Sequence, residues 1–300
     1  MYSSNAIEPR ILLGSSQDAS KMLPEYVGKA RLVVTSPPYH NAISYESHAL
    51  DPTADYRQRA ITDYAGEYLQ LMNSVWAEMW KMLRPGGIIA INVGSVLDDG
   101  YHFPLPMDII QGLEDAEEDW QFIRSILWHK VTAGVKRAGS VIQHPYPGYW
   151  HPNIMTEHII VFRKGSTTHL VNRDCPEEWY QPVWDLAPVP PRTVEHPAPF
   201  PEDLPHRLIR LFTNEKDIVI DPFNGAGSTT KSATDLGRLG VGFDIEKKYV
   251  DLAVKRIDAN AGVRKMQLVV APIHRKDFVP NKAQGKTRHG AGLQTRAGKK

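Results

Sequence analysis

Short apolar runs separated by helical patterns are the feature that most limits how this chain can fold. RILLG (10–14), ARLVVTS (30–36) and DIVID (217–221) have the length and apolar character of buried strands. The segments 63–83 and 247–260 instead place apolar residues at helical spacing. Strands that alternate with helices in this way form a parallel sheet with helices on both faces. The sequence therefore predicts a doubly wound α/β fold with a mostly parallel sheet.

The same patterns predict the remaining elements and a single folded domain. Further strands are expected at 86–94, 121–130, 157–164 and 238–244, and further helices at 18–27, 104–119, 202–213 and 228–237. A chain of 300 residues that is 42% hydrophobic can bury one large core. We expect one domain over residues 1–274, two inserted polar loops at 43–62 and 131–156, and a basic, disordered tail at 275–300.

Composition excludes several classes of protein. No apolar run is long enough to cross a bilayer, and MYSSNAIEPR lacks the charged-then-apolar pattern of a signal peptide. The single cysteine, Cys175, excludes an intramolecular disulfide and a thiolate metal cluster. These features predict a soluble, cytoplasmic protein with no membrane partner. From Arg275 onward eight Lys or Arg accompany one Asp, and this tail either solubilises the chain or attracts nucleic acid phosphates.

A glycine-containing loop, DPFNGAGSTT, joins an expected strand to an expected helix. Gly225 and Gly227 would let the backbone approach a ligand at the helix N-terminus, although glycines alone also fit an ordinary tight turn. Asp244 ends the next expected strand, 17 residues after Gly227, where it could accept hydrogen bonds from a ribose diol. That pattern suits any adenosine-bearing cofactor. Asp221, beside Phe223, would repel a pyrophosphate but attract an ammonium group, which favours S-adenosylmethionine over a nicotinamide dinucleotide.

The motif TSPPY breaks the expected strand at 30–36 with two consecutive prolines. Because each proline lacks an N–H group, Ser36, Pro37 and Pro38 form a rigid corner rich in hydrogen-bond acceptors. Its complement is an NH₂ group, and Tyr39 adds a ring on which a flat base could stack. Cytosine N4 and adenine N6 are such amines. A plain Pro-Pro turn is the alternative, and the cofactor loop in the same chain favours the catalytic interpretation.

Taken together, TSPPY, DPFNGAGST, GFDIEKKYV and EHPAPFPEDL resemble the beta class of amino-methylating DNA methyltransferases, over roughly residues 10 to 260. The catalytic motif comes first and the cofactor loop late, as in the circularly permuted, Rossmann-like methyltransferase sheet of that class. The resemblance implies that Ser36, Pro37, Pro38 and Tyr39 contact the target base. It implies a cofactor site made of Asp221, Phe223, Asn224, Gly225, Gly227, Ser228, Thr229 and Asp244, with His196, Pro197 and Phe200 packed around it.

One position departs from the family pattern. Members often carry Gly-Asp after the first strand, but here Gly14 is followed by Ser15, and whether Asp18 substitutes is open. The resemblance further implies direct methyl transfer without a metal and a base flipped out of double-stranded DNA. Methylation of a ring carbon would need a cysteine nucleophile, and Cys175 lies in an acidic loop segment that argues against it.

The resemblance also implies partners and a target base. A homodimer and a cognate restriction endonuclease are implied partners besides double-stranded DNA. Ser36 favours cytosine N4 over adenine N6 as the target.

Two polar segments carry the residue types that read DNA. Lys136, Arg137, Tyr146 and Tyr149 lie in the 131–156 loop, and Arg57 lies in the 43–62 loop. Ordinary surface loops are the alternative for both. His144, His151 and His158 recur every seven residues, but intervening prolines argue against a metal site. Two other functions remain open from sequence: a nicotinamide-dependent oxidoreductase and a DNA-binding module without catalysis.

Overall fold

The computed structural model describes residues 8–38, 67–98, 101–115, 119–131, 155–166, 168, 171–190, 200–261 and 267–270. Its strands are β1 (Arg10–Leu13), β2 (Ala30–Thr35), β3 (Leu83–Val93), β4 (Val96–Asp98), β5 (Tyr101–Phe103), β6 (Trp120–Lys130), β7 (Thr156–Lys164), β8 (Val183–Leu186), β9 (Ile218–Asp221), β10 (Leu239–Asp244) and β11 (Gln267–Val270). Its helices are α1 (Ala19–Met22), α2 (Leu69–Met82), α3 (Leu105–Glu114), α4 (Asp203–Phe212), α5 (Ser228–Asp235) and α6 (Lys247–Ala261).

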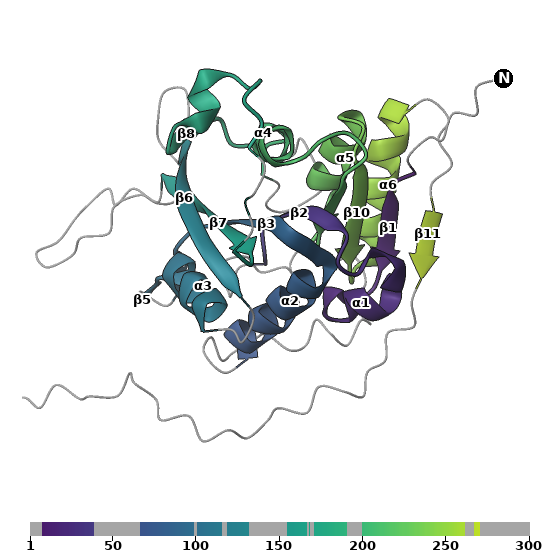
Figure 1. The fold of residues 1–300 in the computed structure, drawn as a ribbon, viewed down its shortest axis with the longest axis horizontal. Helices are drawn as coiled ribbons and strands as arrows, with labels where there is room; N and C mark the ends of the chain where they lie inside the picture. The colour runs from purple at the N-terminus through teal and green to yellow at the C-terminus, as the bar shows by residue number, and fades with distance from the viewer. Residues whose placement is uncertain are drawn as a thin grey trace, which may run out of the picture.

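Within the described residues, nine strands form one sheet in the order β11-β1-β10-β9-β2-β3-β7-β6-β8 (Figure 1). β7 runs antiparallel to its neighbours β3 and β6, while the other adjacent strands of this sheet are parallel. β4 and β5 form a separate antiparallel pair. The mostly parallel sheet predicted from the sequence is confirmed.

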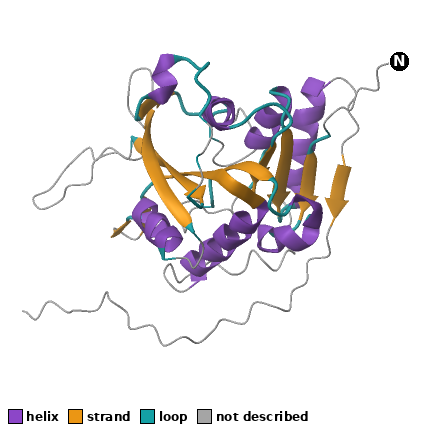
Figure 2. Ribbon diagram, in the orientation of Figure 1, coloured by secondary structure: helices purple, strands orange, loops and turns teal. Residues whose placement is uncertain are grey.

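Helices cover both faces of the sheet because alternate strand residues point to opposite sides. In β1, Leu12 packs in the cluster that contains α1, α2 and α3, whereas Ile11 packs against Val250 and Ala253 of α6. In β2, Val33 faces the first group of helices, and Val34 faces α4 and α5. In Figure 1, α1, α2 and α3 lie below the sheet and α4 lies above it, and Figure 2 shows the same layers by secondary structure. The fold is doubly wound, as expected.

The strand order brings three sequence motifs to one edge of the sheet. β9 lies between β10 and β2, and all three strands are parallel. Their carboxyl ends therefore lie at the same edge, where open α/β sheets bind ligands. Asp221 ends β9, Asp244 ends β10, and Ser36 follows the last residue of β2. The candidate functional site lies at this edge.

Several elements differ from the sequence prediction. The helix expected at 18–27 is only the four-residue α1, because Pro24 lacks the N–H that would continue it and starts a 3₁₀ turn instead. The helix expected at 104–119 ends at Glu114 in α3. The sequence patterns do not predict β4, β5, β8 and β11, since strands of three or four residues carry too little periodicity to detect.

Other sequence predictions fall on parts of the chain outside the described residues. The 43–62 loop and the 275–300 tail lie wholly outside them, and of the 131–156 loop only Val131, Met155 and Thr156 are described. The domain boundary at 274 therefore stays a prediction. No described helix combines the length and the apolar character that a membrane crossing requires.

Candidate functional site

The loop between β9 and α5 depends on its glycines for backbone shape. Gly225 and Gly227 have φ angles of 47° and 81°, a left-handed conformation that other residues adopt at a cost. At Gly227 a Cβ atom would also lie 2.7 Å from the Cβ of Ala253 in α6. Any side chain at position 227 would therefore force the loop away from α6.

Asp244 holds this loop from the end of β10. One carboxylate oxygen accepts a hydrogen bond from the Gly225 N–H at 2.9 Å, and the other accepts from the Glu246 N–H at 2.8 Å. Burial raises the pKa of Asp244 to about 7, against the lowering effect of these two hydrogen bonds. Each carboxylate oxygen has a second lone pair, so the side chain can still accept from a ligand hydroxyl.

Asp221 links the glycine loop to the strand that carries the proline motif. Its buried carboxylate accepts from the Thr35 hydroxyl at 2.7 Å and from the Phe223 N–H at 3.0 Å. The Thr229 hydroxyl is a further partner. Burial raises the pKa of Asp221 to about 6 despite these hydrogen bonds. Because Thr35 directly precedes Ser36, the hydrogen bond joins the two candidate sites.

Two glycines of β10 let the loop and α5 lie close to the sheet. A Cβ at Gly242 would be 2.4 Å from Asn224 Cγ, and one at Gly240 would be 2.7 Å from the Thr230 carbonyl oxygen. Asn224 Oδ1 in turn accepts from the Thr230 hydroxyl at 2.9 Å, which ties the loop to α5. Sequence reasoning missed these glycines, although their spacing of two places them on one face of a strand.

The proline motif continues directly from β2. Ser36 and Pro38 are half-buried and Pro37 is buried. The Pro38 carbonyl accepts a 2.7 Å hydrogen bond from the hydroxyl of Tyr68, a buried residue next to the start of α2. Tyr68 thus holds the second proline in place, a contact that no local sequence pattern indicates.

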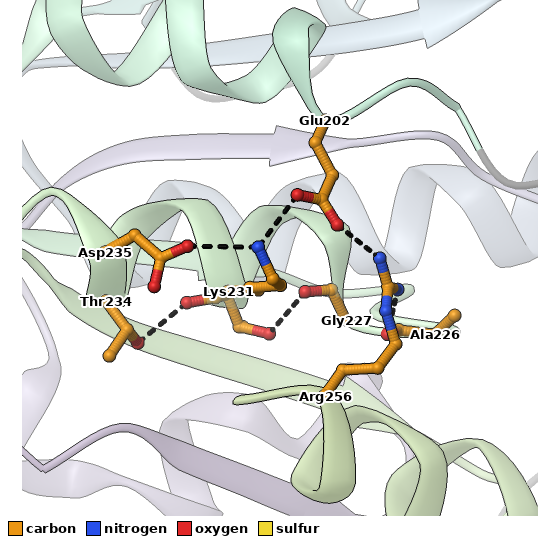
Figure 3. Close-up of polar contacts among 8 residues, drawn as sticks. Glu202, Ala226, Gly227, Lys231, Thr234, Asp235 and Arg256 are labelled. Carbon is orange, nitrogen blue, oxygen red and sulfur yellow. Dashed lines mark hydrogen bonds and ion pairs between the residues drawn. The ribbon is translucent and has the colours of Figure 1, made fainter. Parts of the chain in front are cut away.

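Charged residues connect the loop to the segment before α4 (Figure 3). Arg256 of α6 donates to the carbonyl oxygen of Ala226 and pairs with Glu202. Lys231 of α5 pairs with the same Glu202 at 2.8 Å and with Asp235 at 3.0 Å. Glu202 belongs to the EHPAPFPEDL segment, so this network attaches that segment to the glycine loop.

The remaining predicted site residues divide into described and undescribed ones. Phe200 is half-buried and packs against the cluster that contains α4. Ser228 and Thr229 are buried in the first turn of α5. Asp18 forms an exposed ion pair with Lys21. Outside the described residues lie Tyr39, His196, Pro197, Lys136, Arg137, Tyr146, Tyr149 and Arg57.

The described residues contain no group of three or more His, Cys, Asp or Glu side chains placed to hold a metal ion. His158 lies in β7 with its Nδ1 3.0 Å from the Ser125 hydroxyl, and His144 and His151 are outside the described residues. One exposed apolar side chain, Ile245, directly follows Asp244 and is 46% exposed. It offers an apolar surface next to the carboxylate.

Comparison with known protein families identifies the group to which this arrangement belongs. Residues 30–255 match the N6_N4_Mtase family model, described as DNA methylase. The chain belongs to this DNA methylase family. The match includes both the proline motif and the glycine loop, and it confirms the resemblance to the beta-class amino-methyltransferases.

Individual DNA methylases are similar over most of their length. The Type II methyltransferase M.MjaI of Methanocaldococcus jannaschii is 27% identical over 285 residues, which cover 83% of this chain and 90% of the relative. A Thermus thermophilus protein described as a DNA modification methylase, solved in complex with S-adenosyl-L-methionine, is 26% identical with a TM-score of 0.63. That match covers 87% of this chain and 99% of the other.

A more distant structure shares the fold. PvuII DNA methyltransferase, described as cytosine-N4-specific, is 18% identical with a TM-score of 0.65 and covers 85% of this chain and 89% of its own. At this identity the likeness concerns the architecture alone. Together these structures confirm the Rossmann-like methyltransferase fold.

Proposed function

We propose that this DNA methylase transfers a methyl group from S-adenosylmethionine to the exocyclic amine of a base flipped out of double-stranded DNA. The hydrogen bond between Thr35 and Asp221 carries the proposal. It joins an acceptor-rich corner suited to an amine to a loop suited to an adenosine cofactor. An amine site next to a cofactor site suits a reaction between the two ligands. A simple Pro-Pro turn would not need a hydrogen bond to the glycine loop.

The residues of the loop fit S-adenosylmethionine better than a phosphate-bearing cofactor. Asp221 at the end of β9 would repel a pyrophosphate and attract the ammonium of the methionine moiety. Asp244 retains lone pairs for the ribose hydroxyls, and the exposed Ile245 beside it can cover an adenine ring. When bound, S-adenosylmethionine supplies an electrophilic methyl group. The complex of the Thermus thermophilus relative supports this choice.

The proline motif is proposed to hold the amine. Ser36 and the Pro37 carbonyl accept its two hydrogens, which draws the nitrogen toward a pyramidal shape and frees its lone pair. The Pro38 carbonyl already accepts from Tyr68, which leaves the Pro37 carbonyl as the proposed acceptor. The amine nitrogen would take the methyl group in place of the cofactor sulfur, and its extra proton would pass to solvent. Tyr39 is proposed to stack on the base.

Cytosine N4 is the proposed target, with adenine N6 as the alternative. Ser36 is a neutral acceptor, and in the beta class the Ser-Pro-Pro-Tyr form favours cytosine. DNA methylated by the purified protein should be digested to nucleosides and analysed by mass spectrometry. N4-methylcytosine is the expected product. N6-methyladenine alone would reverse the choice of base. The absence of any methylated nucleoside would overturn the proposal.

Two competing functions have distinct outcomes in the same preparation. A nicotinamide-dependent oxidoreductase predicts calorimetric binding of a nicotinamide dinucleotide, which Asp221 disfavours. A DNA-binding module without catalysis predicts DNA binding with no transfer of labelled methyl groups. DNA contacts by Lys136, Arg137, Tyr146, Tyr149 and Arg57, a homodimer and a cognate endonuclease stay predictions.

A further inference from the structure

Asn92 is a buried polar residue with an unused acceptor. It lies in β3, it is 2% exposed, and its Oδ1 has no hydrogen-bond partner among the described residues. Buried side-chain acceptors are normally paired, because leaving one unpaired is unfavourable. Four other buried side-chain atoms of the described residues also lack a partner, but all four are nitrogens, so Asn92 Oδ1 is the unpaired acceptor among them. Such an acceptor can receive a donor that arrives with a ligand.

Strand register places Asn92 beside the proline motif. β2 and β3 are parallel, and Thr35 pairs with Ile91 in the last step of their ladder. The next residues along the two strands are Ser36 and Asn92. Asn92 therefore lies at the carboxyl edge of the sheet, level with the residue that is proposed to hold the amine.

Two charged residues set the orientation of the Asn92 amide. Glu157 of β7 accepts from Asn92 Nδ2 at 2.7 Å and forms an ion pair with Lys130 of β6. A carboxylate in an ion pair accepts hydrogen bonds but donates none, so it requires the nitrogen of the amide on its side. Oδ1 is consequently the amide atom turned away from Glu157. Asn92 and Ser36 each follow by two positions a residue of the cluster that contains α4, Ala90 and Val34, so both side chains lie on the same face of the sheet. The neighbour of β3 on its other side is β2, with Ser36.

Strand order also separates this acceptor from the cofactor loop. Asp221 and Asp244 end β9 and β10, which lie on one side of β2, whereas Asn92 lies in β3 on the other side. A ligand that reaches Asn92 Oδ1 would thus lie over β2 and β3 rather than over β9 and β10. The group there must carry a hydrogen-bond donor, and the amine of the target base does.

We propose that Asn92 is a further substrate-binding residue, whose Oδ1 shares one hydrogen of the target amine with Ser36 in a three-centre hydrogen bond, while the Pro37 carbonyl accepts the other. Glu157 and Lys130 are positioning residues that keep the amide in the accepting orientation. The inference rests on the proposed methyl transfer and adds a contact made only by a base that carries an amine. Asn92 thereby helps reject bases whose corresponding position bears a carbonyl, as in thymine and guanine, since two acceptors would face each other.

The test compares DNA with and without the amine. Once the target site has been mapped by sequencing methylated DNA, duplexes are made with the normal base or its amine-free analogue, 2-pyrimidinone for cytosine or purine for adenine. The preference for the amine is measured as the ratio of affinities for the amine-bearing and the amine-free duplex, because the weaker base pair of the analogue eases flipping equally for every variant. Asn92→Ala and the similarly sized Asn92→Leu should each reduce that preference roughly tenfold. The affinity for S-adenosylmethionine should stay within about twofold in both variants, as no cofactor contact is lost.

Asn214→Ala is the matched control, because Asn214 is exposed and its side chain takes part in no described hydrogen bond at the site. It should keep the wild-type preference. Glu157→Gln should act through Asn92, because a glutamine can also donate and so lets the amide turn over. It should lower kcat while the cofactor affinity is retained, and it should add little further loss to Asn92→Leu.

The outcomes separate this inference from the proposed function. If the wild-type protein methylates none of the DNA tested, the proposed function itself is wrong. An active wild-type enzyme whose folded Asn92→Leu variant keeps the full preference for the amine would overturn only the role of Asn92. Melting curves identify any variant that fails to fold. If one of the two Asn92 variants does not fold, the other provides the test.

Discussion

Asp221 and Asp244 are two carboxyl groups with different tasks at the same sheet edge. Asp221 is buried and joins the two motifs through Thr35, whereas Asp244 holds the loop backbone and keeps lone pairs for a ligand. Burial raises the pKa of both, to about 6 and about 7. Carboxyl groups with raised pKa values in a ligand crevice are typical of functional sites, where a bound cation or hydroxyl offsets the cost of burial.

Replacing Asp244 should weaken cofactor binding more than a ribose contact alone would. Asp244→Ala removes the acceptor for ribose and also frees the Gly225 and Glu246 N–H groups, so we expect a loss of about 1.5–3 kcal/mol. Asp244→Asn should also be harmful, because its NH₂ group would face one of two N–H donors. Calorimetric titration with S-adenosylmethionine measures the effect. Unchanged affinity in a folded Asp244→Ala protein would contradict the ribose assignment.

Asp221 should make cofactor affinity depend on pH. Its pKa of about 6 lies above the ordinary value of 3.8, so below pH 6 the folded protein holds the neutral acid, which attracts an ammonium weakly. We expect binding of S-adenosylmethionine to be roughly tenfold weaker at pH 5 than at pH 7. In Asp221→Asn the affinity for S-adenosylmethionine should be low at both pH values and should depend less on pH. The remaining pH dependence would come from Asp244. An identical pH profile in both proteins would refute the role of Asp221.

The raised pKa of Asp221 has the opposite effect on the stability of the cofactor-free protein: stability should fall with rising pH, whereas cofactor affinity should rise. A raised carboxyl pKa means that the native state binds more protons than the unfolded state between pH 3.8 and about 6. The contribution of Asp221 to the free energy of unfolding therefore falls as pH rises through this window. Cofactor binding should compensate by pairing the carboxylate with a cation.

Tyr68, next to the start of α2, holds the proline motif through a hydrogen bond to Pro38. Tyr68→Phe would leave the Pro38 carbonyl without this donor, at a cost of about 1–3 kcal/mol. Part of that cost should appear as slower methyl transfer, because the proline corner loses its fixed position. Single-turnover rates and cofactor titrations test this together: the rate should fall while cofactor affinity is unchanged. A rate equal to that of the wild type would mean that the prolines hold the corner without Tyr68.

Contacts of β10 with α5 and with the cofactor loop should respond differently to one added methyl group. Gly240→Ala would strike the backbone of Thr230 and push α5 from the sheet, at a cost of about 1–3 kcal/mol in stability. Gly242→Ala would displace Asn224 and should weaken cofactor binding as well. Melting temperatures and cofactor titrations separate the two. Gly28→Ala is the control for cofactor binding: its Cβ meets no atom within 4 Å, but the left-handed φ of 68° at this position should lower stability without affecting the cofactor.

Local patterns in the sequence predicted most of the fold and the two motifs, but not the contacts between distant elements. Asp221 and Ser36 can be identified from the sequence because glycines or prolines follow each of them directly after an expected strand. The Thr35–Asp221 bond spans 186 positions and depends on β9 pairing with β2, which no local pattern shows. In the sequence, Asn92 is only a single polar residue in an apolar strand. Its contact with Glu157, which pairs with Lys130, is visible only in the folded structure.

For the molecule as a whole, Asp221 and Asp244 put two carboxyl groups at the sheet edge, so we expect cations from other parts of the chain to attract the DNA backbone. Positive charge is uneven along the sequence: from Arg275 onward eight Lys or Arg accompany one Asp, within a chain of net charge +1. This distribution predicts that the tail contributes to DNA affinity independently of the target site.

Deleting the chain from Lys282 onward should weaken nonspecific DNA binding and leave the target sequence unchanged. The deletion removes six Lys or Arg residues. Each phosphate contact adds about 0.9 to the slope of log affinity against log salt concentration, so the truncated protein should show a shallower slope. Binding to a duplex without the target site, measured between low and moderate salt, gives the slopes, and sequencing of methylated DNA gives the target. Since phosphate contacts carry no base information, both proteins should methylate the same sites. Equal slopes would show that the tail makes no phosphate contacts and acts only as a solubilising segment.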